Sequence, residues 1–289
     1  MVEEMESLIK NRAWTLVDRP RNQIIVSCEW IFKTKEGILG VEKVRLVARG
    51  FTQREGVDYN EIFSLVVKHS SIRMILALVA DRNMELEQLD VKVTFLHGEL
   101  EETVYMQQPE GFVKDKNKVC LLRKSLYGLK QSPRQWYECF DEYILHIGFT
   151  RSKFDSCVYI RFENDQVLAY LLLYVDDMLI ASKNIYEIVT IKSFLQAEFE
   201  MKDLGPAQKI LGMEITRDRQ KGELYLSQRS YIKKVIDIFG MKDAKPVSTP
   251  MAHYFKLTSS QSPTTDEEEK FMAKVPYASA VGSVMYSMV

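Results

Sequence analysis

LLLYVDDMLI, residues 171 to 180, sets two adjacent carboxylates, Asp176 and Asp177, between two apolar runs. Each run has the length and β-branched or aliphatic character of a strand, so the stretch predicts a β-hairpin with the acids at its tip. Burying a charge without a partner is costly, so the two acids require water, a basic partner or cations. An acidic β-turn and a metal site are equally good interpretations of this stretch alone, because Asp is common in turns.

A third acid, Asp90, ends an apolar strand-like segment in QLDVKVTFLHG, residues 88 to 98. It favours the metal site, because cations shared by carboxylates of neighbouring strands catalyse phosphoryl transfer. In that chemistry Asp90 and Asp176 would be the shared ligands, and Asp177 would be an adjacent, looser one. Two Mg²⁺ ions are expected, with Mn²⁺ as a substitute. Spacing alone does not show that Asp90 meets the pair in space.

Helical and strand-like patterns follow one another along the chain without a regular strand–helix–strand rhythm. Helical spacing covers residues 3–11, 70–81, 132–147, 185–199 and 228–239, and strand-like runs cover residues 24–33, 44–48, 86–93, 157–162, 167–180, 209–216 and 224–226. This order predicts an α+β fold. Residues 259–269 are rich in Ser, Thr, Pro and acids, which is typical of a linker, and residues 277–289 look like the start of an ordered element.

Composition is that of a globular protein, with 46% hydrophobic and 27% charged residues among 289. We expect an intracellular protein, cytoplasmic or nuclear, and no membrane partner, because neither a signal peptide nor a membrane-spanning run is present. The four cysteines, Cys28, Cys120, Cys139 and Cys157, are scattered, so we expect reduced core thiols and neither a zinc site nor a disulfide framework.

The distribution of charge says more than the net charge of −1, which by itself argues against a nonspecific nucleic-acid binder. Residues 43–54 carry Lys43, Arg45, Arg49 and Arg54 and no acid. Residues 114–134 carry seven basic residues and one acid, Asp115. Such stretches can follow nucleic-acid phosphates, but a solvated charged face is an equally good interpretation of either one.

A series of longer motifs gives a specific resemblance. These motifs are RLVARGFTQREGVDYNEIFS, LEQLDVKVTFLHGELEETVYMQQPEGF, SLYGLKQSPRQWY, YLLLYVDDMLIA, FEMKDLGPAQKILGMEI, LSQRSYI and AKPVSTP. In type and order they resemble successive blocks of plant copia-type retrotransposon Pol polyproteins, in the reverse transcriptase domain. The resemblance covers nearly the whole chain.

The resemblance implies a right-hand polymerase of α+β class with fingers, palm and partial thumb, and with an antiparallel palm sheet packed on helices. Asp90, Asp176 and Asp177 would be its catalytic, metal-binding carboxylates. Phe95 would be the bulky gate that rejects a ribose 2′-hydroxyl, although plain core packing competes with this role. The other implied residues fall into three groups: Lys43 and Arg45 at the triphosphate, Gly128, Lys130, Gln131, Ser132 and Pro133 lining the nucleotide and template pocket, and Leu211, Gly212 and Met213 as primer grip.

The function implied is that of an RNA-directed DNA polymerase, a nucleotidyltransferase that extends a primer with dNTPs. Its partners would be an RNA or DNA template with primer, dNTP substrates and other pieces of the polyprotein. Residues 1–245 would form fingers, palm and partial thumb, and residues 246–289 a linker with the truncated start of the segment toward an RNase H domain. The alternative is a catalytically inactive retrotransposon fragment that retains nucleic-acid binding. A generic α+β protein with an acidic turn would make the ordered motifs accidental.

Departures from the family pattern favour the alternative. GVEKVRLVARG, residues 40–50, is several residues short just before Arg45, in the loop expected to clamp the nucleotide. Val93 and Thr94 replace a pair that is commonly Asn or Thr followed by Ala. Glu29 and Leu65 stand where Lys and Pro are usual. The intact acids favour the active enzyme.

Overall fold

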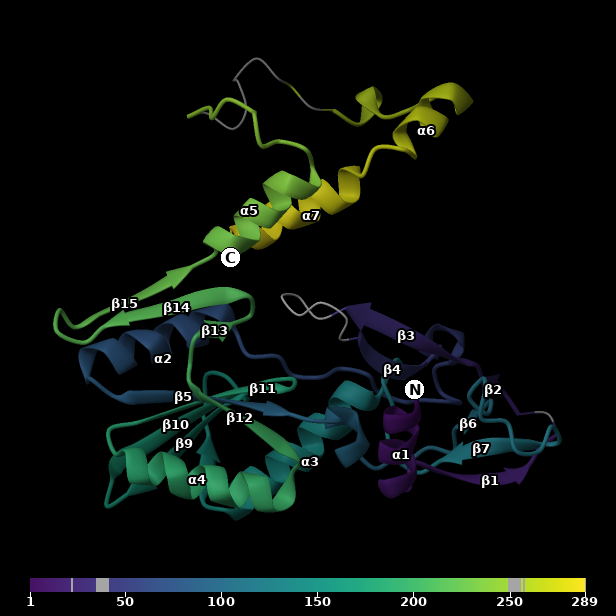
Figure 1. Cartoon of the computed structure of the whole chain (residues 1–289), viewed down its shortest axis with the longest axis horizontal. Coiled ribbons are helices and arrows are strands. Elements are labelled where there is room, and N and C mark those ends of the chain that lie inside the picture. The colour runs from purple at the N-terminus through teal and green to yellow at the C-terminus, as the bar shows by residue number, and fades with distance from the viewer. Residues whose placement is uncertain (22, 35–41, 249–255, 257, 289) are drawn as a thin grey trace. The chain divides into compact units, whose positions relative to one another are not determined.

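A computed structural model describes the chain apart from residues 22, 35–41, 249–255, 257 and 289, and apart from the side chains of residues 34, 42 and 43 (Figure 1). The chain divides into two compact units, Met1–Ala207 and Gln208–Val289. The expected division between a polymerase part, residues 1–245, and a linker part, residues 246–289, is a different one. It stays a prediction.

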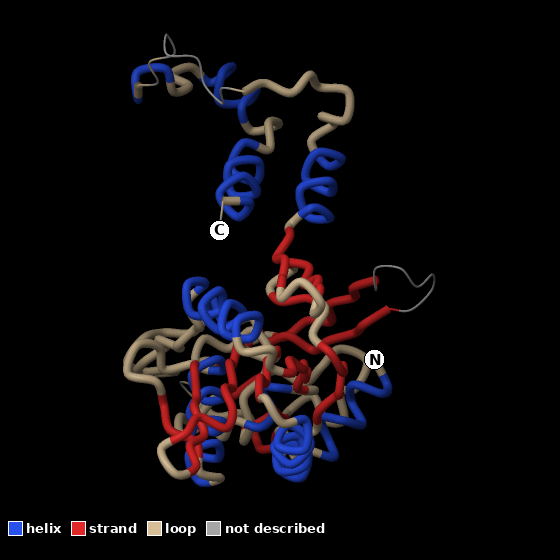
Figure 2. The backbone as a smooth tube through the Cα atoms, turned by 90° about the vertical axis from the view of Figure 1, so that its left-hand side faces the viewer, coloured by secondary structure: helices blue, strands red, loops and turns tan. Residues whose placement is uncertain are grey.

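A six-stranded antiparallel sheet forms the centre of the first unit. In spatial order its strands are β12 (Met201–Pro206), β5 (Glu85–Val91), β11 (Asp177–Ser182), β10 (Gln166–Tyr174), β9 (Val158–Glu163) and β8 (Phe149–Arg151). Helices α3 (Ser132–His146) and α4 (Ile185–Glu198) cover one face, and α2 (His69–Asp81) lies on the other (Figure 1). Figure 2 shows the whole chain with strands in red and helices in blue.

The main core lies between the sheet and the helices α3 and α4. Leu89 of β5 and Met178 of β11 are fully buried there, opposite one another in the strand register, with Trp136 and Phe140 of α3. Because successive strand residues point to opposite faces, the neighbours Asp90 and Asp177 point to the face away from this core.

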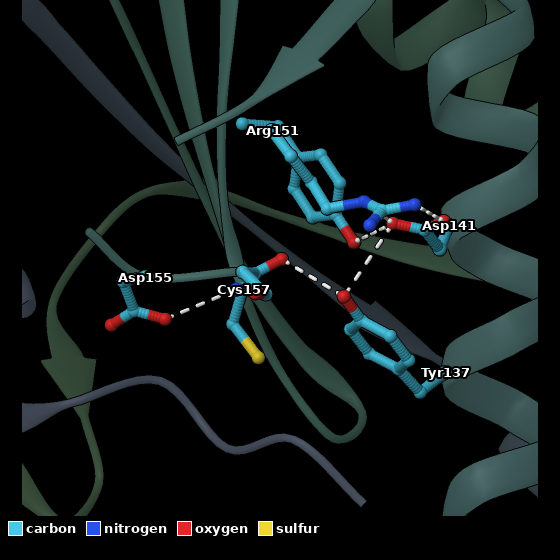
Figure 3. A network of polar contacts seen from close by, with 7 residues as sticks. Tyr137, Asp141, Arg151, Asp155 and Cys157 are labelled. Carbon is cyan, nitrogen blue, oxygen red and sulfur yellow. Dashed lines mark hydrogen bonds and ion pairs between the residues drawn. The ribbon is translucent and has the colours of Figure 1, made fainter. Parts of the chain in front are cut away.

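A polar network ties α3 to the sheet (Figure 3). Asp141 of α3 accepts hydrogen bonds from the Tyr159 hydroxyl at 3.0 Å and from the Arg151 guanidinium at 2.7 Å. The hydroxyl of Tyr137 donates to the Ser156 carbonyl at 3.1 Å, next to Cys157. Buried polar groups that have hydrogen-bond partners stabilise a unique packing. This network therefore fixes the helix α3, which begins with the sequence SPRQWY.

The N-terminal part of the first unit contains smaller elements around a second core. Helix α1 (Val2–Lys10) packs there with a four-stranded sheet and a hairpin, whose strands are β1 (Trp14–Asp18), β7 (Lys118–Leu122), β6 (Tyr105–Met106), β2 (Ile25–Val26), β3 (Cys28–Thr34) and β4 (Glu42–Ala48). Two short 3-10 helices, η1 (Gly50–Thr52) and η2 (Thr94–His97), follow β4 and β5.

The second unit consists of a three-stranded sheet and helices. Its elements are β13 (Lys209–Ile210), β14 (Met213–Asp218), β15 (Glu223–Ser227), α5 (Arg229–Ile238), η3 (Ser259–Gln261), α6 (Asp266–Met272) and α7 (Tyr277–Ser287). The ordered element expected from residue 277 is the helix α7, and the stretch 259–269, expected to be a linker, contains η3 and the first part of α6.

The α+β class and the five expected helices are confirmed. Two expected strands are wrong as single strands. Residues 209–216 are divided by the turn at Leu211 and Gly212, between β13 and β14. Residues 24–33 are divided into β2 and β3, which belong to different sheets. Strands β1, β6, β7, β8 and β12 were not expected from the pattern. In the part of the chain that the structure describes, no helix is both long and apolar enough to cross a bilayer.

Candidate active site

The strand register brings the three acids together at one end of the central sheet. Asp177, the first residue of β11, lies directly opposite Asp90 of β5 in the antiparallel pairing. Asp176 precedes it in the turn, and its carbonyl accepts a hydrogen bond from the Val91 amide at 2.9 Å. Side chains directly opposite one another in such a pair have Cβ atoms about 5 Å apart. The hairpin expected from the sequence is therefore present, and Asp90 does meet it.

The turn that carries Asp176 has a strained backbone held by one buried side chain. Val175 has a φ of +53°, a conformation that a β-branched residue rarely adopts. Its carbonyl accepts a hydrogen bond of 2.6 Å from the indole Nε1 of Trp136, a residue that is 1% exposed. Trp136 is packed in turn against His97 and Phe199, at ring distances of 5.7 and 5.3 Å. The core thus fixes the position of the turn.

The acids repel one another. The pKa of Asp177 is raised from 3.8, first because burial disfavours its charged form, and also because Asp176 and Asp90 are negative. A hydrogen bond of 3.2 Å from the Gln88 side-chain amide to Asp177 Oδ1 works in the opposite direction. A site that concentrates negative charge in this way favours the binding of cations.

The raised pKa of Asp177, caused first by burial and then by the neighbouring acids, predicts that Asp177→Asn stabilises the protein in metal-free buffer. The pKa of Asp177 in the folded state lies above its ordinary value of 3.8, so folding favours the protonated carboxyl. The native state therefore loses stability as the pH rises from 3.8 through the folded-state pKa and the carboxylate becomes charged. We expect the variant to melt at a higher temperature than the wild type at pH about 7 and at nearly the same temperature at pH about 3. Thermal melting in EDTA checks this, and a variant that is less stable at neutral pH would contradict it.

The donor chemistry of the three acids fits divalent cations. Carboxylate oxygens are the ligands that Mg²⁺ prefers, and the ends of β5 and β11 bring three carboxylate groups to the site. Yet among the described residues no group of three His, Cys, Asp or Glu side chains is gathered closely enough to hold an ion. The backbone positions therefore fit a metal site, and the carboxylates would have to turn toward one another around the ion.

Beside the acids lies a cluster of aromatic and basic side chains from three elements. Phe95 of η2 packs edge to face against Tyr127, with ring centroids 4.7 Å apart. Arg45 belongs to the strand β4, and its guanidinium lies 5.3 Å from the centroid of the Tyr127 ring. Burial and the charge of Asp176 raise the pKa of Tyr127, so this ring is within electrostatic reach of the acids. Lys43 belongs to β4 as well, but its side chain lies outside the described residues.

The loop that contains Gly128, Lys130 and Gln131 is tightly bonded to the segment after β4. Gln131 is fully buried, and its amide donates to the Asp58 carbonyl at 3.0 Å and accepts from Gln53 Nε2 at 3.0 Å. The Lys130 ammonium donates to the Tyr59 hydroxyl at 3.0 Å.

Ser132 is also fully buried, and its hydroxyl donates to the Leu126 carbonyl at 2.6 Å. Pro133 stands in the first turn of α3, where the missing amide N–H costs nothing. Gln131 and Ser132 therefore have internal bonding partners, and their contact with a nucleotide stays a prediction.

In the second unit, Leu211 and Gly212 form a two-residue hairpin turn. Both have positive φ, +51° and +71°, as a type I′ turn requires, and Ile210 pairs with Met213 across it. The hydroxyl of Tyr286, on α7, donates a hydrogen bond to the Leu211 carbonyl. The three residues expected to be a primer grip thus lie together at one hairpin.

Comparison with known proteins identifies the family. The family model described as "Reverse transcriptase (RNA-dependent DNA polymerase)" matches residues 11–253. The chain belongs to this reverse transcriptase family. The resemblance expected from the motifs is confirmed.

Similar curated proteins are retrotransposon polyproteins. The chain is 53% identical over 294 residues to the retrovirus-related Pol polyprotein from transposon TNT 1-94 of Nicotiana tabacum, an alignment that covers 100% of the chain and 22% of the relative. It is 42% identical over 293 residues to the Pol polyprotein from transposon RE1 of Arabidopsis thaliana, with coverage of 99% and 19%. The reverse transcriptase chain thus spans about a fifth of the length of these relatives.

Among solved structures, the chain is similar to a foamy viral protease-reverse transcriptase described in complex with double-stranded DNA. The TM-score is 0.42 at 12% identity, and the alignment covers 83% of this chain and 39% of the other. A truncated telomerase from Candida tropicalis has the same TM-score at 9% identity, with coverage of 78% and 60%.

Trp136 supports the turn of the candidate site, whereas the sequence pattern predicts only a core position for it in the helix 132–147. Trp136→Phe keeps an aromatic ring but removes the donor to the Val175 carbonyl, so the strained turn is free to relax. We expect nucleotide incorporation to fall about tenfold and stability to fall by about 1–2 kcal/mol. Trp30→Phe is the matched control, because the Trp30 indole also donates to a main-chain carbonyl, that of Glu110, at 3.0 Å. Equal rates in the two variants would contradict a role of Trp136 in the turn.

Tyr127 and Gln53 are two further residues of the candidate site that the sequence pattern does not predict. Tyr127 stands inside the quoted motif SLYGLKQSPRQWY, but the pattern does not show that its ring meets Phe95 and Arg45. Gln53 lies far from Gln131 in sequence, and only the folded chain reveals their hydrogen bond.

The basic stretches are partly engaged in ion pairs. Arg49 bonds to Glu29 at 2.6 Å, and Lys124 bonds to Glu99 at 3.1 Å. Arg134 bonds to Glu138 at 2.8 Å and also to Glu61. Exposed pairs of this kind are weak, so nucleic-acid phosphates could replace the carboxylates at small cost.

Proposed function

We propose that this chain is the RNA-directed DNA polymerase core of a copia-type retrotransposon polyprotein. It extends a primer with dNTPs by phosphoryl transfer that two divalent cations assist. The observation that supports this most strongly is the pairing of Asp90 with Asp177, next to Asp176 in the turn, within a chain of the reverse transcriptase family.

Each part of the site has a role in the proposed reaction. Asp90, Asp176 and Asp177 would hold the cations, which would favour ionisation of the primer 3′-hydroxyl and neutralise charge on the triphosphate. Arg45 contacts the triphosphate, because a guanidinium matches the geometry of phosphate oxygens. Phe95, backed by the Tyr127 ring, blocks a ribose 2′-hydroxyl.

Nucleic-acid contacts extend beyond the acids. The hairpin Leu211–Met213 holds the primer end, and the basic residues of 43–54 and 114–134 contact template and primer phosphates. The chain acts inside the cell, in the cytoplasm or the nucleus, alongside other pieces of its polyprotein.

Primer extension tests the proposal. Purified chain is incubated with poly(rA), oligo(dT), dTTP and Mg²⁺, beside the double variant Asp176→Asn, Asp177→Asn. Incorporation by the wild type that disappears in the double variant is the expected result. Equal incorporation by both would place the activity elsewhere.

An inactive fragment that retains nucleic-acid binding is the second candidate. It is favoured by the sequence before Arg45, which is several residues shorter than the family pattern. The loop concerned, residues 35–41, lies outside the described residues. A wild-type chain that is folded, binds the primer–template and incorporates nothing would support this candidate.

A further inference from the structure

An ion pair joins the N-terminal helix to the strand that carries Arg45. Arg45 Nη1 lies 2.9 Å from Glu4 Oε2, and the two side chains are only 23% and 10% exposed. The pair between Arg49 and Glu29 on the same hairpin is 44% and 43% exposed. Since solvent screens a shielded pair less, the bond to Glu4 is the stronger restraint on its arginine.

Helix α1 presents Glu4 from a rigid support. Met5 and Leu8 of α1 are buried in the same core as Leu46 and Ala48 of β4, so helix and strand are packed together. Glu3, the preceding residue of the helix, is exposed. The geometry therefore assigns to Glu4, and not to its neighbour, the contact with β4.

On its other side Arg45 reaches the candidate nucleotide site. Its guanidinium lies 5.3 Å from the Tyr127 ring centroid, and that ring packs at 4.7 Å against Phe95. A guanidinium carries five N–H donors, so a bond to Glu4 through Nη1 leaves donors for phosphate oxygens. Glu4, Arg45, Tyr127 and Phe95 thus form one chain of contacts from α1 to the neighbourhood of the acids.

We propose that Glu4 is a positioning residue of the nucleotide site, which holds the Arg45 guanidinium ready for the triphosphate of the incoming dNTP. This inference rests on the proposed function, in which Arg45 contacts that triphosphate. An arginine released from Glu4 would have to be immobilised at each binding event, which weakens binding about 3- to 10-fold. Nothing in the α1 sequence alone indicates this role.

Steady-state primer extension with Glu4→Gln tests the inference. The substitution keeps the size of the side chain and removes its charge, and Glu3→Gln is the matched control on the same helix. We expect the KM for dTTP to rise about 3- to 10-fold in Glu4→Gln, with kcat within about twofold of the wild type. Glu3→Gln should leave both constants unchanged, and Glu4→Asp, which keeps the charge, should recover part of the loss.

A double-variant cycle shows whether Glu4 acts through Arg45. In an Arg45→Gln background, Glu4→Gln should cause no further change in KM, whereas independent residues would give additive effects. An unchanged KM in Glu4→Gln, a lower KM, or an equal rise in both backgrounds would overturn the inference. Thermal melting confirms that each variant is folded.

A binding measurement separates this inference from the proposed function. If the wild-type chain incorporates no dTTP, the proposed polymerase activity fails. The affinity of the chain for dTTP with Mg²⁺, measured by calorimetry on the primer–template complex, then tests Glu4 without chemistry. Weaker binding by Glu4→Gln than by Glu3→Gln would support the inference, and equal or absent binding would overturn it.

Discussion

Asp90→Asn is expected to reduce the rate of dTTP incorporation about a thousandfold. The residue lies opposite Asp177 across the strand pair, so the change removes one of the proposed cation ligands while keeping side-chain size. Losing a ligand that stabilises charge in the transition state costs on the order of 10²- to 10³-fold or more in rate. Single-turnover primer extension at saturating dTTP measures the chemical step directly.

Asp81→Asn is the matched control for this prediction. Asp81 is exposed at the end of α2, so its substitution makes the same change in charge as Asp90→Asn but away from the three acids. It should incorporate dTTP at the wild-type rate. An Asp90→Asn chain that is folded and retains more than about a tenth of the wild-type rate would contradict the role given to Asp90.

Gly128→Ala is expected to destabilise the protein by about 3 kcal/mol or more and to abolish activity. Gly128 has a φ of +91°, and a Cβ atom added there would lie 2.0 Å from the Ala48 carbonyl oxygen. The Ala48 amide donates a hydrogen bond to the Tyr127 carbonyl at 2.7 Å, and this bond holds the end of β4 against the loop. Relief of the clash would shift the end of β4 or the loop at Gly128, and these two segments carry Arg45 and Tyr127 of the proposed nucleotide site.

Gly148→Ala separates the clash from backbone strain. Gly148 has a similar φ of +93°, but a Cβ atom added there would meet nothing within 4 Å. Only the left-handed backbone is penalised, by about 1–2 kcal/mol, and activity should remain. Urea unfolding of the two variants, with primer extension on each, checks both expectations. Equal losses of stability would show that the close approach at Gly128 is not the cause.

The hairpin of LLLYVDDMLI and the class of the fold could be predicted from the sequence, because alternation, apolar runs and turn residues are local properties. Asp90 could be predicted as a partner only through chemistry and resemblance. Its meeting with Asp177 depends on the register of β5 against β11, which no local pattern determines.

The supports of the site could not be predicted in the same way. The bond from Trp136 to the Val175 carbonyl and the pair of Glu4 with Arg45 join residues 39 and 41 positions apart in the chain. The positive φ of Val175 could not be predicted either, because β-branched residues do not favour that conformation and the surrounding packing imposes it. The resemblance implies that Gln131 lines the nucleotide pocket, which stays a prediction, whereas its burial and its bonds to Gln53 and Asp58 arise only in the folded chain.

The measurement that tests the central claim most directly is a titration of the chain with Mn²⁺, followed by electron paramagnetic resonance in the presence of primer–template and dTTP. The claim is that Asp90, Asp176 and Asp177 together hold the two proposed cations. It predicts that the double variant Asp90→Asn, Asp177→Asn binds Mn²⁺ at least about tenfold more weakly than the wild type and than Asp81→Asn. Equal Mn²⁺ affinity in all three chains would contradict the claim.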